Sequence, residues 1–70
     1  MANIDIIQEK NFVDGQYSLM LYKNSRSYAV ELVDNDDGFA FWKKAFPTET
    51  EANTFFKRTC LKYEREGLYA

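Results

Sequence analysis

Alternating apolar and polar residues run from the N-terminus to Pro47 and predict four β-strands. We expect them at residues 4–13, 16–23, 28–33 and 39–46, with short polar segments between them. Asp14-Gly15 is the strongest turn signal, because both central positions of a type I′ turn need positive φ. Connections this short join antiparallel neighbours, so the strands should form a four-stranded antiparallel meander.

A helical pattern follows Pro47. Thr48 with Glu51 three residues later forms a capping box, and Gly67 suits the left-handed position after a helix end. Between them, an apolar stripe at three-and-four spacing predicts one amphipathic helix to about Glu66. The stripe consists of Ala52, Phe55, Phe56, Thr59, Cys60 and Tyr63. The sequence therefore predicts a single α+β domain, 1–70, of order ββββα, with the helix packed on one face of the sheet.

Loop lengths assign the strand residues to the two sheet faces. A four-residue loop at 34–37 would place Leu32 opposite Phe39 and Val30 opposite Phe41. The face expected under the helix then holds Tyr17, Leu19, Leu21, Tyr28, Val30, Leu32, Phe39 and Phe41. No second helix remains for the opposite face, which holds Met20, Tyr22, Ala29, Glu31, Val33, Ala40, Trp42 and Lys44.

The first strand fits this pattern least well. A two-residue turn at Asp14-Gly15 brings Phe12 and Ile6 to the helix side, but Lys10 and Gln8 come with them. An edge strand with a bulge could accommodate this, since an inward-pointing charge there protects against edge pairing. Alternatively, the pairing starts elsewhere, and the residues leave both possibilities open.

Composition excludes several kinds of chemistry. The chain has 70 residues, one cysteine and no histidine, so it holds no serine–histidine triad, no cysteine–histidine pair and no ordinary zinc site. We expect no catalytic residues, no metal and no cofactor. The net charge of −2 is unevenly distributed, because residues 1–42 carry −4 and residues 43–70 carry +2.

Charged residues gather in the loop at 34–37 and on one flank of the predicted helix. Asp34, Asp36 and Asp37 precede Gly38, but the spacing fails the EF-hand calcium pattern and favours a solvated hairpin turn. A meander places these aspartates and Asp14 of the first hairpin at one end of the sheet, and Lys43 at the opposite end with Lys23, Arg26 and Lys44. This charged rim can orient a partner, or its loops merely keep the domain in solution. On the helix, Arg58, Lys62 and Arg65 lie on one flank, either as a solvated face or as a phosphate contact.

The chain is expected to be cytoplasmic. It has no run of about 18 apolar residues that could span a membrane. Its single cysteine, Cys60, cannot form an internal disulfide, and its first residues lack the basic-then-apolar pattern of a signal peptide.

The functional hypothesis concerns the sheet face without a helix. An exposed apolar patch of several hundred Å² usually marks an interaction site. We therefore expect partner binding through Met20, Tyr22, Trp42 and Lys44. The alternatives are that residues 1–12 or Leu68-Tyr69 fold over these side chains, that they bind single-stranded nucleic acid, or that they form a homodimer of a structural protein.

The element order is similar to that of many small sheet-plus-helix modules. The strand-to-helix junction resembles the junctions of these modules in its arrangement of elements only, and consists here of Phe46-Pro47-Thr48 followed by Glu51-Ala52 and Phe55. Such modules include adaptor domains and stand-alone phage or mobile-element proteins, among them anti-CRISPR inhibitors. The sequence thus favours a non-enzymatic protein-binding module, such as a small inhibitor or regulator of a larger protein.

Overall fold

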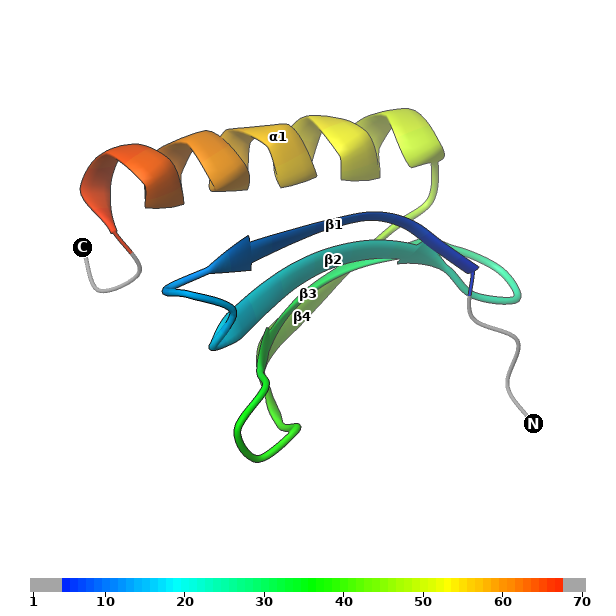
Figure 1. Ribbon diagram of the computed structural model, residues 1–70. Coiled ribbons are helices and arrows are strands. Elements are labelled where there is room, and N and C mark those ends of the chain that lie inside the picture. Colours follow the sequence, from blue (N-terminus) through cyan, green and yellow to red (C-terminus); the bar gives the residue numbers. More distant parts are fainter. Residues whose placement is uncertain (1–4, 68–70) are drawn as a thin grey trace.

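The computed structural model describes residues 5–67, which form four strands and one helix. The elements are β1 (Asp5–Phe12), β2 (Tyr17–Lys23), β3 (Tyr28–Asp34), β4 (Ala40–Phe46) and α1 (Glu49–Glu66). The strands pair antiparallel in chain order, and α1 lies over one face of the sheet (Figure 1). The predicted ββββα architecture is confirmed. Residue 4, where the first strand was expected to begin, and Leu68-Tyr69 lie outside the described residues.

The predicted turn and helix signals act as expected. At the first hairpin, the amide of Gln16 donates to the carbonyl of Val13, and Asp14 and Gly15 both have positive φ. At the start of α1, Thr48 Oγ1 accepts a hydrogen bond from the amide of Glu51. These local contacts satisfy backbone groups that the ends of strands and helices leave free.

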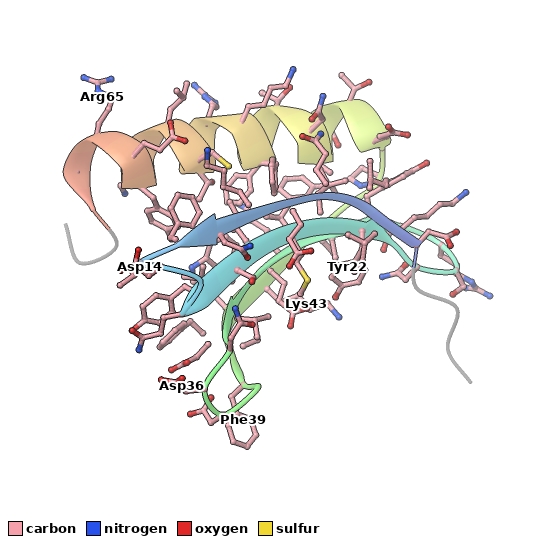
Figure 2. All side chains as sticks on the ribbon, in the orientation of Figure 1. Asp14, Tyr22, Asp36, Phe39, Lys43 and Arg65 are labelled. Atoms are coloured by element: carbon pink, nitrogen blue, oxygen red, sulfur yellow. The ribbon has the colours of Figure 1, made fainter. Side chains whose placement is uncertain are left out.

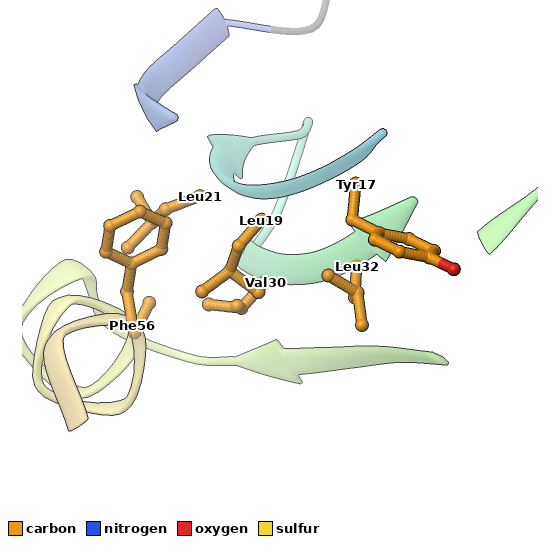
Figure 3. Packing of buried hydrophobic residues seen from close by; sticks show 7 residues of the cluster. Tyr17, Leu19, Leu21, Val30, Leu32 and Phe56 are labelled. Atoms are coloured by element: carbon orange, nitrogen blue, oxygen red, sulfur yellow. The ribbon is translucent and has the colours of Figure 1, made fainter. Parts of the chain in front are cut away.

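The core lies between α1 and the two central strands. Leu19, Leu21 and Val30 are completely buried, and Phe56 of α1 packs against them (Figure 3). The register of β2 and β3 is the predicted one, with Leu19 opposite Leu32 and Leu21 opposite Val30. Leu19, Leu21, Val30 and Leu32 therefore face the helix, as expected.

The predicted register of β4 is wrong. Trp42 lies opposite Leu32 and Lys44 opposite Val30, three residues further along β4 than predicted. Val33 pairs with Ala40, which shifts the register by two residues without exchanging the faces, and a bulge between the pairs with Val33 and Leu32 adds the third residue. One extra residue in a strand moves every later side chain to the other face. Trp42 and Lys44 therefore lie on the side of α1. Phe39 and Phe41, expected under the helix, are instead 74% and 58% exposed.

A second bulge resolves the ambiguity of β1. The pairing shifts between Ile6 and Gln8, so Gln8, Lys10 and Phe12 face α1 while Ile6 does not. Each inward-facing side chain has a partner on the helix: Gln8 donates to Asn53, Lys10 forms an ion pair with Glu64 at 2.7 Å, and the Phe12 ring contacts Tyr63 edge-on. The polar residues of β1 thus contact the polar flank of α1, not the core.

Candidate functional site

The sheet face opposite α1 is not the exposed aromatic patch that the sequence predicted. Tyr22 lies on it but is only 6% exposed, and Met20 is partly buried. The Tyr22 hydroxyl donates to Glu31 Oε1 at 2.8 Å, and Lys43 Nζ lies 5.7 Å from the centroid of its ring. Figure 2 shows Tyr22 and Lys43 on this side of the sheet. The ring therefore lies across the sheet beneath a lysine instead of projecting into solvent.

This network predicts a loss of stability at alkaline pH. Burial raises the pKa of Tyr22 above its ordinary value of 10.0, and the hydrogen bond to Glu31 raises it further, against the opposing effect of Lys43. Below pH 10.0 the hydroxyl is protonated in both folded and unfolded chains, so its stabilising contribution is complete. As the pH rises toward the folded-state pKa, the unfolded chain loses the proton first and this contribution disappears.

The corresponding variant is Tyr22→Phe. At neutral pH it should lower the free energy of unfolding by about 1 kcal/mol, because one hydrogen bond is lost. Urea titrations on both sides of pH 10.0 should show the wild type losing more stability than Tyr22→Phe over the alkaline range. A constant difference between the two proteins across that range would mean that the hydroxyl is not protected by folding.

The aspartates of the predicted charged rim organise turns. The carboxylate of Asp34 accepts from the amide of Asp36, and that of Asp37 accepts from the amide of Phe39. Asn35 connects this loop to the first hairpin. Its backbone N–H donates to the carbonyl of Gln16, and its side-chain Nδ2 donates to the carbonyl of Gly15. The two acidic loops therefore lie at the same end of the sheet, as expected. Residues 5–67 contain no group of acidic or cysteine side chains placed to bind a metal ion.

A basic groove lies between the edge strand β4 and the helix. This β4–α1 groove is shallow, has a volume of about 630 Å³, and is lined by Trp42, Lys43, Lys44, Phe55, Arg58, Thr59, Lys62 and Tyr63. All four of its charged lining residues are exposed cations, and three of them, Lys44, Arg58 and Lys62, lie on the α1 side, whereas the ammonium of Lys43 lies over Tyr22 on the opposite face. In a chain of negative net charge, this is a local concentration of positive charge that attracts anionic groups.

Aromatic contacts fix the floor of the β4–α1 groove. Trp42 packs edge-on against Phe55 with ring centroids 5.8 Å apart, and its Nε1–H donates to Tyr63 Oη at 3.3 Å. Lys44 Nζ lies over the Phe55 ring, 5.1 Å from the centroid, and 5.8 Å from that of Phe46. Lys44 is therefore held against the aromatic floor, which lowers the entropic cost of ordering this cation around a ligand.

The structure separates the four predicted partner-binding residues. Met20 and Tyr22 lie on the sheet face opposite α1, whereas Trp42 and Lys44 lie in the β4–α1 groove with Arg58 and Lys62. The spacing of Arg58 and Lys62 had indicated a basic flank of the helix. Their proximity to Trp42 and Lys44 could not be predicted without the bulge. Arg65, the third member of that flank, does not line the groove and points away from the sheet (Figure 2).

Exposed aromatic rings continue the edge beyond the β4–α1 groove. Phe39, which leads into β4, points into solvent near Asp36 (Figure 2), and Phe41 contacts the ring of Tyr17 while remaining mostly exposed. These two rings and the groove follow one another along the same edge of the domain. The edge thus offers an apolar part and a cationic part to one partner.

Comparisons with protein-family models, with curated proteins and with solved structures find no match. Within residues 5–67, no helix has both the length and the apolar character needed to cross a membrane.

Proposed function

We propose that this chain is a non-enzymatic protein-binding module that holds its partner along β4, in the β4–α1 groove and against the exposed rings of Phe39 and Phe41. The specific form that we propose is a stand-alone inhibitor or regulator of a larger protein. A phage-type protein acting in the host cytoplasm is the form we favour. The single observation that carries this proposal is the groove, where Lys44, Arg58 and Lys62 meet on an aromatic floor.

The aromatic part of the edge supports a protein as partner. Aromatic and arginine side chains are enriched at the centres of protein interfaces, where a few of them contribute most of the affinity. Phe39 and Phe41 are the two most exposed of the large apolar side chains within residues 5–67. A protein surface with apolar and acidic parts would satisfy both ends of this edge.

Nucleic acid is the second candidate, favoured by the cations alone. Single-stranded nucleic acids bind by stacking bases on open aromatic faces inside a basic groove. In the β4–α1 groove, however, Lys44 already lies over Phe55 and Phe46. The open ring of Phe39 adjoins Asp36 and Asp37, whose charges repel phosphate. The rings and the cations are thus arranged less favourably for a nucleic-acid strand than for a protein.

Site-directed photo-crosslinking tests this proposal. A photo-reactive phenylalanine derivative is placed at Lys62 in the β4–α1 groove, at its neighbour Leu61, and at Met20 on the opposite sheet face. We expect an adduct with one protein from position 62, and much less from positions 61 and 20. Positions 61 and 62 differ by about 100° around the helix, which makes Leu61 a matched control.

Two results would contradict the proposal. A protein adduct from position 20 alone would show that the partner binds to the sheet face opposite α1. An adduct from position 62 that nuclease treatment removes would identify nucleic acid as the partner.

A further inference from the structure

The outer edge of β4 is a place where another strand can pair. β4 is the last strand of the sheet and pairs with β3 on one side, and within residues 5–67 no strand pairs with its other side. An unpaired edge presents a row of backbone N–H and C=O groups to solvent. Extended peptides bind to such edges by adding a strand, and side-chain contacts on alternate residues then select among them.

The lysines of β4 restrict which strand can pair there. Lys43 and Lys44 are both exposed, and lysines on an edge strand disfavour edge-to-edge pairing. Two copies of this chain joined along β4 would bring these lysines toward each other, which opposes a homodimer through this edge. A strand that carries carboxylates would meet them favourably, because opposite charges on neighbouring strands stabilise a sheet.

The spacing of the helix cations matches that of a strand. Arg58 and Lys62 are four residues apart on α1, which corresponds to about 6 Å along the helix axis. Alternate residues of a strand, whose side chains share one face, are about 6.7 Å apart. α1 extends along the sheet above the strands (Figure 1). Carboxylates on alternate residues of an added strand can therefore face Arg58 and Lys62 in turn.

The opposite end of the edge has a different character. The start of β4 carries the exposed Phe41, preceded by Phe39, and the neighbouring loop carries Asp36 and Asp37. An acidic segment would be repelled there, whereas apolar side chains would cover the two rings. The two ends of the edge therefore differ: it is cationic toward the end of β4 and apolar toward its start.

We infer that the partner contributes an extended segment, acidic at alternate positions and apolar at one end, which adds to β4 as a fifth strand. Its carboxylates contact Lys44, Arg58 and Lys62, and its apolar end covers Phe39 and Phe41. This inference rests on the proposed protein-binding function and specifies the chemistry of the partner.

Three synthetic peptides of about ten residues test it. The first alternates glutamate and threonine and ends in two leucines. The second has the same composition with its glutamates in one block, and the third is the first with N-methylated amides on alternate residues, which blocks strand pairing. Binding is followed through the fluorescence of Trp42, the single tryptophan of the chain, which lines the groove.

The alternating peptide should bind at least about tenfold more tightly than either control. The double variant Arg58→Glu, Lys62→Glu should remove this binding, whereas Lys57→Glu, on the flank of α1 that faces β1, should leave it unchanged. Equal affinity for the three peptides, or no binding by any, overturns the strand inference while an adduct from position 62 still supports protein binding. If a thymidine oligonucleotide of equal charge displaces the alternating peptide at equal concentration, both the strand inference and the proposed protein-binding function are overturned.

Discussion

Replacing Trp42 by alanine is expected to remove most of the stability of the protein. The indole packs on Phe55, its Nε1–H donates to Tyr63, and it lies opposite Leu32 against the core. Truncating a large core aromatic costs about 3–5 kcal/mol, and a partly buried one falls near the lower value. A domain of this size rarely has more than about 3–5 kcal/mol of stability, so urea denaturation followed by circular dichroism should show the loss of most of it.

Two further variants show how much of this loss comes from the packing of the indole. One removes only its hydrogen bond, and the other truncates an exposed ring. Trp42→Phe retains a ring against Phe55 but removes the donor to Tyr63, and should cost about 1 kcal/mol. Phe39→Ala, at a ring 74% exposed, should change the stability by no more than about 0.5 kcal/mol. If Trp42→Ala proved as mild as Phe39→Ala, the indole would lie outside the core and the register of β4 would be wrong.

The sequence was sufficient for the architecture because local signals and periodicity agreed. Asp14-Gly15 and the Thr48 cap specified where elements turn or begin, and the alternation in β2 and β3 gave their register correctly. The apolar stripe assigned Phe56 to the helix face that packs on the sheet, where it is buried in the same cluster as Leu21. Each of these features depends on residues that are close in sequence or on a regular period, which is two in a strand and about 3.6 in a helix.

The candidate site could not be predicted in the same way. Its geometry depends on one extra residue in β4, and a bulge on an edge strand leaves no signal in the hydrophobic pattern, since either face of β4 contains aromatic residues. Without the bulge, Trp42 and Lys44 fall on the face away from Arg58 and Lys62, and the basic flank of the helix looks like an ordinary solvated surface. Tyr22 was placed on the correct face, but its hydrogen bond to Glu31 and the overlying Lys43 were not foreseen.

Reversing two charges of the β4–α1 groove should have the largest effect on partner binding. Lys44→Glu with Arg58→Glu replaces two of its four cations by carboxylates and leaves the aromatic floor in place. Interfacial charge pairs that lose one partner cost about 2–5 kcal/mol, and like charges placed together add repulsion. The affinity for the protein that crosslinks to position 62 should therefore fall at least about 100-fold.

The matched control is Arg26→Glu with Lys57→Glu. It also exchanges one lysine and one arginine, so the change in net charge is identical. Arg26 lies in the turn between β2 and β3, and Lys57 lies one helical turn after Asn53, which bonds to Gln8 of β1, and does not line the groove. Thermal melts of both double variants establish that they remain folded.

The most direct test of the groove as the partner-binding site is the comparison of these two double variants by titration calorimetry with the purified partner. A loss of about 100-fold for Lys44→Glu, Arg58→Glu, beside a change within about threefold for the control, is the predicted result. Equal affinities of the two folded variants would show that binding depends on net charge or on another surface, and would contradict the assignment of the site to the β4–α1 groove.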